Sequence, residues 1–305
     1  MVGLPADNDL SFVREFNPAG VILMGRNARP ASQIRALSEQ LSGMIVASDH
    51  EGGRVQRLKD GFSIVPPARE VGQGGAENVK RTAQLVAGEL QSAGINFNFA
   101  PVCDVPVHEG DTVIGARAFS TDFARAGELA SAYVEGLQSG NVGACAKHFP
   151  GHGGVGVDSH LGLPIFEGTR EELEPHLLPF RAAIEAGVGA MMVAHIQVPC
   201  LEETGAPASL SRPIITELLR EELGFVGLVV SDDLEMGALA QLGAGEIAVR
   251  ALQAGSDLLL FCHTQSKAIE ARDAIQAALE SGRLERGRVE DALEQVGRFK
   301  RRFGR

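Results

Sequence analysis

The chain has little positive charge, few cysteines and no long hydrophobic run, and each shortage argues against a class of protein. Its 28 lysines and arginines are outnumbered by 39 aspartates and glutamates, so the formal net charge is −11. This surplus of negative charge argues against a general nucleic-acid binder. No apolar stretch approaches the roughly 18 residues that a membrane span needs, and the first ten residues lack the basic start and apolar core of a secretory signal. We therefore expect neither nucleic acid nor a membrane as a partner.

The cysteine pattern indicates reduced thiols. The four cysteines are Cys103, Cys145, Cys200 and Cys262. They lie far apart, and three of them stand in strongly apolar runs, which is unlike a disulfide framework or a CxxC metal knuckle. A cytoplasmic location fits this pattern best. The sequence gives no sign of a cofactor or a bound metal.

Short apolar runs recur along the chain and are separated by longer amphipathic stretches that are typical of helices. The runs are MVGL (1–4), GVILM (20–24), MIVAS (44–48), INFNFAPV (95–102), ACAK (144–147), GAMMVAH (189–195), GLVVS (227–231) and DLLLFC (257–262). Apolar residues at successive positions indicate parallel strands that are buried on both faces. Eight such units predict a single (β/α)8 TIM barrel over 1–305, with two closing helices from about residue 264. A doubly wound open sheet is the alternative, because periodicity does not give strand order.

Polar residues collect at or just after the carboxyl ends of these runs, where the active site of a barrel lies. They are Asp49, Asp104, Lys147, His148, His195, Asp232, Asp233 and His263. A single one of them is most simply a loop carboxylate or a helix cap. Their convergence on one barrel mouth predicts a catalytic pocket.

The segment KHFPGHGGVGVDSHLGLP, residues 147–164, is the densest in chemistry. Gly151, Gly153 and Gly156 satisfy the pattern GxGxxG, but VDSHLGLP follows instead of a helix. No helix N-terminus is then available for a pyrophosphate, so we reject a dinucleotide site. The glycines are expected to form a mobile loop that can move residues 158–160 over a substrate.

Asp158 and His160 in this loop form a candidate acid/base pair. They are two residues apart, which places both side chains on one side of an extended segment. A carboxylate beside an imidazole fixes its tautomer and leaves a group that gives and takes a proton near neutral pH. A plain surface turn is the alternative for this triplet alone.

Other charged residues complete the candidate site. Asp232 stands at a strand end, where a rigid backbone can hold a nucleophile, and Asp233 could cap the next segment or orient neighbours. In SDHEGGRVQR, Asp49 can accept hydrogen bonds from sugar hydroxyls and Arg57 can hold it in place. Arg117 lies in the loop IGARAF, where an isolated arginine is more often solvated.

Together these segments resemble the family 3 glycoside hydrolases, and among them the small bacterial β-N-acetylglucosaminidases of cell-wall recycling. The resemblance spans nearly the whole chain and is carried by GVILMGRN, DHEGGRVQR, NFAPVCDV, IGARAF, KHFPGHG with DSH four residues later, AHIQVP and GLVVSDDLEM. One departure is Met24, where the family usually has Phe.

The resemblance implies a retaining exo-β-N-acetylglucosaminidase that acts on a small saccharide or muropeptide. It implies that Asp232 is the nucleophile and that His160 is the acid/base, oriented by Asp158. The implied sugar-binding residues are Asp49, Arg57, Arg117, Lys147, His148 and His195. In this mechanism a glycosyl-enzyme intermediate forms on the carboxylate and water then hydrolyses it. The N-acetyl preference comes from the resemblance alone.

Three alternatives stay open. The histidines near the barrel mouth could surround a metal, as in a metal-dependent hydrolase, although HxH and HExxH are absent. A phosphorylase could use the same covalent intermediate, because a neutral histidine repels phosphate less than a carboxylate does. A barrel that binds sugar without turnover would belong to a different class. The oligomeric state is not given by the sequence.

Overall fold

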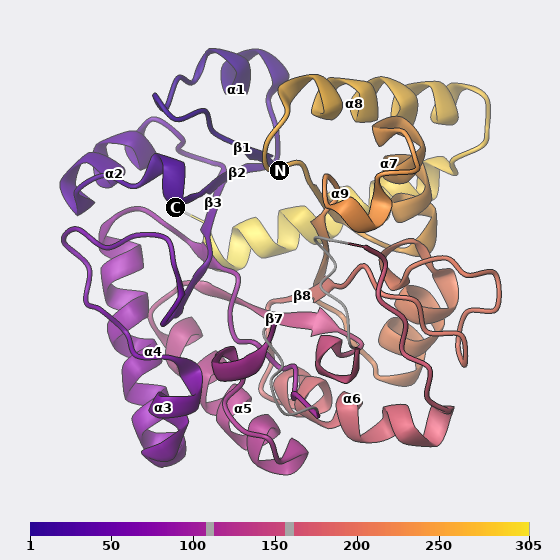
Figure 1. Ribbon diagram of the computed structural model, residues 1–305. Coiled ribbons are helices and arrows are strands. Elements are labelled where there is room, and N and C mark those ends of the chain that lie inside the picture. Colours follow the sequence, from indigo (N-terminus) through magenta and orange to yellow (C-terminus); the bar gives the residue numbers. More distant parts are fainter. Residues whose placement is uncertain (108–112, 156–161, 305) are drawn as a thin grey trace.

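The strands form a closed parallel barrel (Figure 1). The computed structural model describes residues 1–107, 113–155 and 162–304, in which eight strands make one sheet. In sheet order they are β1 (Val2–Gly3), β2 (Gly20–Leu23), β3 (Ile45–Ser48), β6 (Phe97–Asn98), β7 (Gly143–Phe149), β8 (Ala190–Val193), β9 (Leu228–Asp233) and β10 (Leu258–Leu260). Val2 also bridges to Phe261 in parallel, so the first and last strands meet. This closure confirms the predicted (β/α)8 barrel and excludes the open sheet.

Each predicted apolar run overlaps one of these strands, and alternate residues of a strand serve two different cores. In β2, Ile22 packs in the barrel interior with Phe97 and Leu228. Its neighbours Val21 and Leu23 pack in the layer between the strands and the helices. Because successive side chains of a strand point to opposite faces, a strand with two buried faces needs an apolar residue at every position.

Helices surround the barrel in chain order (Figure 1). They are α1 (Ser11–Phe16), α2 (Ala31–Glu39), α3 (Ala68–Gln73), α4 (Gly75–Ser92), α5 (Phe123–Ser139), α6 (Arg170–Glu185), the π-helix η5 (Pro213–Glu222), α7 (Ala244–Ala254), α8 (Gln265–Glu280) and α9 (Arg286–Phe303). Short 3-10 turns are η1 (Gly25–Asn27), η2 (Gly115–Arg117), η3 (His152–Gly154), η4 (Ala208–Leu210) and η6 (Gly237–Leu239). A small antiparallel hairpin, β4 (His50–Gly52) with β5 (Val55–Gln56), follows β3. Within the described part, no helix is both long and apolar enough to span a bilayer.

The two predicted closing helices are α8 and α9, and α9 seals one end of the barrel. Phe299 of α9 contacts Phe97 at a ring-centroid distance of 4.6 Å. A side chain at Gly143, the first residue of β7, would collide with the Phe299 ring. The helix therefore covers the amino ends of the strands, as its yellow ribbon behind the centre of Figure 1 shows. The carboxyl ends remain available for a site.

The packing of α9 against the amino ends of the strands predicts a large loss of stability for Phe299→Ala. The Phe299 side chain is 4% exposed, and its removal leaves a cavity between α9 and the strands, so we expect the free energy of unfolding to fall by about 3–5 kcal/mol. Leu293→Ala is the matched control, because Leu293 lies on the same helix and is 66% exposed. Its effect should stay below about 0.5 kcal/mol in urea unfolding. Equal losses of unfolding free energy for both variants would contradict the proposed packing of Phe299 against the strands.

Candidate active site

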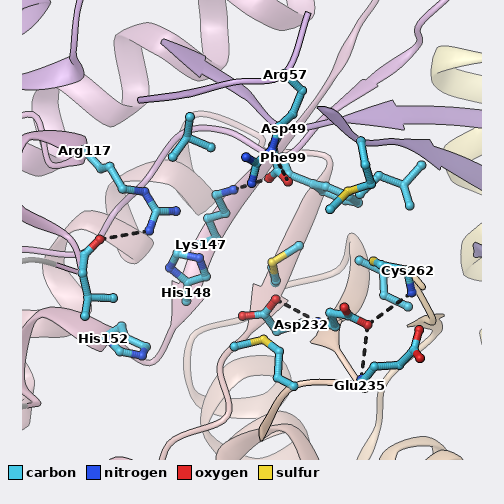
Figure 2. Close-up of a pocket in the computed structure, with 18 of the residues that line it drawn as sticks. Asp49, Arg57, Phe99, Arg117, Lys147, His148, His152, Asp232, Glu235 and Cys262 are labelled. Carbon is cyan, nitrogen blue, oxygen red and sulfur yellow. Dashed lines mark hydrogen bonds and ion pairs between the residues drawn. The ribbon is translucent and has the colours of Figure 1, made fainter. Parts of the chain in front are cut away.

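A cavity of about 540 Å³ lies at the carboxyl ends of the strands (Figure 2). Most of the residues singled out in the sequence line it, namely Asp49, Arg57, Arg117, Lys147, His148, Asp232, Asp233 and His263. Met24, the departure from the family pattern, also lines this cavity. The parallel strands thus bring together residues that are far apart in the chain.

Acidic and basic side chains alternate along one side of the cavity, in the order Asp49, Lys147, Glu51 and Arg117. Lys147 Nζ lies 2.7 Å from Asp49 Oδ1 and 2.6 Å from Glu51 Oε1. Arg117 forms a fork with Glu51, because its Nε and one terminal nitrogen each donate to a carboxylate oxygen at 2.8 Å. Arg57 Nε approaches Asp49 at 3.9 Å, too far for a direct hydrogen bond. Arg57 was expected to hold Asp49 in place, but Lys147 makes the closer contact with that carboxylate.

Glu51, which lies behind this side of the cavity and pairs with its cations, is a residue that sequence reasoning missed. It lies on β4, two residues after Asp49, and the spacing of two in an extended segment was a signal that both carboxylates face one way. Burial alone would raise the pKa of Glu51, but the charges of Lys147 and Arg117 outweigh it and lower that pKa to about 2. The plainer alternative, a solvated Arg117, does not hold, because the side chain is 15% exposed and paired with Glu51.

His148 is oriented by a buried aspartate. Asp104 accepts a hydrogen bond from His148 Nδ1 at 2.6 Å and from the backbone amide of His152 at 2.6 Å. Burial would raise the pKa of Asp104, but the neighbouring His148 lowers it below its ordinary value. The ionised carboxylate fixes the proton on Nδ1, so Nε2 is the ring nitrogen that remains available.

Asp232 stands at the end of β9 and lines the cavity opposite Lys147 and Arg117 (Figure 2). Its Oδ1 accepts a hydrogen bond from the Asp233 amide at 2.8 Å. Burial would raise the pKa of Asp232, but His148, the hydrogen bond from the Asp233 amide and the charge of Lys147 outweigh this effect and lower it. The carboxylate is therefore ionised at neutral pH, as a nucleophile requires.

His195 lies behind the β9 strand end and is not part of the cavity wall. It is fully buried, and both of its ring nitrogens contact protein atoms. Nε2 lies 3.0 Å from the Asp233 carbonyl, which can only accept, so Nε2 carries the proton and Nδ1 accepts from the Ser209 hydroxyl at 2.7 Å. Burial lowers the pKa of His195, which keeps the ring neutral. The geometry gives His195 a supporting position behind the strand that carries Asp232.

Asp233 orients its neighbours, one of the two roles expected for it. Its Oδ1 accepts hydrogen bonds from the amides of Glu235 and Cys262, each at 3.2 Å, and its Oδ2 lies 3.2 Å from His263 Nε2. Burial raises the pKa of Asp233 from 3.8 to about 6, although these contacts oppose the rise. The two adjacent aspartates therefore differ in protonation behaviour.

The candidate pair Asp158 and His160 lies outside the described residues, as does the expected loop motion. The preceding turn η3 is described, and it explains one glycine of the GxGxxG match. A Cβ on Gly153 would lie 2.0 Å from the Val105 carbonyl oxygen, so close packing requires glycine there. A three-residue 3-10 turn follows Gly151 in place of a long helix, which agrees with the rejection of a dinucleotide site.

The metal alternative gains no candidate ligand set from the part of the chain that is described. Across 1–107, 113–155 and 162–304, no group of three or more His, Cys, Asp or Glu side chains has an arrangement that could hold a metal ion. The four cysteines are all free thiols, as their spacing predicts.

The raised pKa of Asp233 predicts a distinct pH dependence of stability. The folded chain keeps a proton on Asp233 up to about pH 6, whereas the unfolded chain loses it near 3.8. The stabilising effect of this proton is thus full below pH 3.8 and is lost as the pH rises to 6. As the pH falls from 7 to 4, the free energy of unfolding of the native chain, measured in urea, should rise by roughly 2 kcal/mol relative to that of Asp233→Asn. Asp291→Asn, an exposed position on α9, is the control, and parallel curves for native chain and Asp233→Asn would refute the shift.

Comparison with known proteins places the chain in a family. Residues 5–299 match the model of the glycosyl hydrolase family 3 N terminal domain. A beta-hexosaminidase of Thiobacillus denitrificans is 41% identical over 258 residues, which cover 80% of this chain and 71% of that protein. A beta-hexosaminidase of Tolumonas auensis is 41% identical over 268 residues, covering 84% of this chain and 79% of that one.

Solved structures agree with the sequence relatives. A family 3 β-N-acetylglucosaminidase from Paenibacillus sp. str. FPU-7 superposes with a TM-score of 0.94 at 38% identity, and the match covers 99% of this chain but 60% of that one. A family 3 glycosyl hydrolase from Mycobacterium smegmatis has a TM-score of 0.89 at 34% identity and covers 98% of this chain and 93% of its own. The chain therefore belongs to glycosyl hydrolase family 3.

Proposed function

We propose that this chain is a retaining exo-β-N-acetylglucosaminidase that removes terminal β-linked N-acetylglucosamine. The observation that carries the proposal is an ionised aspartate, Asp232, at a strand end in a cavity whose opposite wall presents Lys147 and Arg117. A fixed carboxylate facing a polar, charged wall suits a sugar held by its hydroxyls over a nucleophile. The choice of an N-acetylated sugar follows the similarity to proteins named beta-hexosaminidase.

In the proposed mechanism, Asp232 attacks the anomeric carbon while the glycosidic C–O bond breaks. His160, oriented by Asp158, gives a proton to the leaving oxygen. The same histidine then removes a proton from water, which attacks the glycosyl–Asp232 ester and releases the sugar with its original β configuration. The roles of His160 and Asp158 rest on the motif KHFPGHG with DSH four residues later.

Substrate binding is assigned to the wall opposite Asp232. Asp49 can accept hydrogen bonds from sugar hydroxyls, while Lys147 and Arg117 can donate to sugar oxygens. Nε2 of His148 remains available because Asp104 holds the other ring nitrogen. Arg57 at the rim is 36% exposed, so it suits a part of the substrate that lies toward solvent.

The natural substrate is proposed to be a small saccharide or muropeptide derived from peptidoglycan, and the site of action the cytoplasm. Four free thiols support a reducing compartment. The substrate assignment extends the similarity to β-N-acetylglucosaminidases and needs a direct test.

The decisive experiment compares nitrophenyl β-N-acetylglucosaminide, glucoside and xyloside with and without added phosphate. We expect preferred cleavage of the N-acetylglucosaminide with free sugar as the product, and at least about a 10³-fold loss of turnover for Asp232→Ala. Asp273→Ala, an exposed aspartate on α8, is the control with unchanged turnover. Sugar 1-phosphate in the presence of phosphate would indicate the phosphorylase. Binding without release would indicate the non-catalytic barrel.

His160→Ala tests the acid role. Loss of a general acid should reduce cleavage of substrates with poor leaving groups far more than cleavage of activated aryl glycosides, because the latter leave without a proton. We expect at least about a 100-fold difference between the two losses in kcat/KM. Similar losses on both substrates would argue against His160 as the acid.

A further inference from the structure

We propose that Glu51 is a positioning residue that sets the direction of both cations, Lys147 and Arg117, that face the sugar. The proposal rests on the proposed function, because it assigns those cations to sugar binding. Glu51 is absent from the lining of the main cavity and borders a small pocket of about 120 Å³ behind Arg117. It acts on the substrate through its two partners.

The contacts of Glu51 connect three separate parts of the chain. The carboxylate is on β4, Lys147 is on β7 and Arg117 ends the short turn η2. Oε1 contacts the lysine ammonium at 2.6 Å and the arginine at 2.8 Å, while Oε2 accepts from the arginine Nε at 2.8 Å. One side chain thus fixes two cations that no shared element of secondary structure aligns.

The N–H groups of Lys147 and Arg117 that do not bond to protein are the ones available to a substrate. Lys147 has three N–H groups, and carboxylates of Asp49 and Glu51 lie within 2.7 Å in two directions, so one direction remains. Arg117 has five, and among the described residues two of them point to Glu51 and one to the Val113 carbonyl at 3.2 Å, which leaves two. The cations therefore present three N–H groups in fixed directions.

Electrostatics explains why a carboxylate is needed between the two cations. The side chains of Lys147 and Glu51 are 3% and 5% exposed, so water does little to screen the charges. Arg117 opposes the charge on Lys147, whereas Asp49 and Glu51 support it and together raise the pKa of Lys147 above its ordinary value despite burial. Without Glu51, Lys147 would keep Asp49 as its carboxylate contact, whereas Arg117 would lose the fork that fixes its plane.

Glu51→Gln tests the proposal with little change in size. The amide has one oxygen and turns an N–H group toward a cation, so at least one cation loses its partner. Hydrogen bonds from these cations form in the ground state and the transition state alike, so we expect KM for the aryl N-acetylglucosaminide to rise about 10- to 100-fold while kcat changes less than about threefold. Glu89→Gln is the matched control, because Glu89 bonds Ser63 and lies outside the cavity lining.

A second variant and a double mutant keep the test decisive. Glu51→Asp retains the charge and shortens the side chain, so KM should rise about threefold to tenfold even if Glu51→Gln does not fold. If Glu51 acts through Arg117, adding Glu51→Asp to Arg117→Met should raise KM by less than the single change does. An unchanged KM, or a fall of kcat alone, in an active native background would overturn the proposal. An inactive native chain would instead refute the proposed function.

Discussion

The site depends on the pairing of buried charges at the carboxyl ends of the strands. Lys147 is almost fully buried and contacts two carboxylates, Asp49 and Glu51, within 2.7 Å. A buried charge that lacks a partner is costly, so each of these ions requires the next one along the wall. The pairing is possible because the barrel brings the end of β7 beside the hairpin that follows β3. The fold thereby places these paired charges along one side of the cavity mouth.

The fold was largely readable from the sequence, because burial on both faces demands uninterrupted apolar runs. The eight runs each overlap a strand, and the tail after residue 264 forms α8 and α9 as expected. What the pattern could not give is which end of the barrel α9 covers. That depends on Phe299 meeting Phe97 and on Gly143 leaving room for the ring, and these contacts join residues far apart in the chain.

The candidate site was readable only in part. Residues that follow strands were found because a parallel barrel places all such positions at one mouth, and most of them line the cavity. The partners of those residues were harder to predict. Glu51 meets Arg117 across 66 positions of sequence, and His195 lies behind the strand end although it follows β8 directly. The position of a residue relative to a strand predicts the end of the barrel at which its side chain lies. Which side chains it contacts there depends on tertiary packing, which the local sequence does not give.

The adjacent aspartates show how packing separates two chemically identical groups. Both are largely buried, and burial raises the pKa of a carboxyl group. For Asp232 this effect is outweighed by His148, by the hydrogen bond from the Asp233 amide and by Lys147, so its pKa falls. For Asp233 burial outweighs the hydrogen bonds and His263 that oppose it, the nearby acid Glu235 adds to the rise, and the pKa reaches about 6. The sequence left the choice between the two to family resemblance, and the structure adds a difference in surroundings, because both carboxylate oxygens of Asp233 contact neighbouring protein groups.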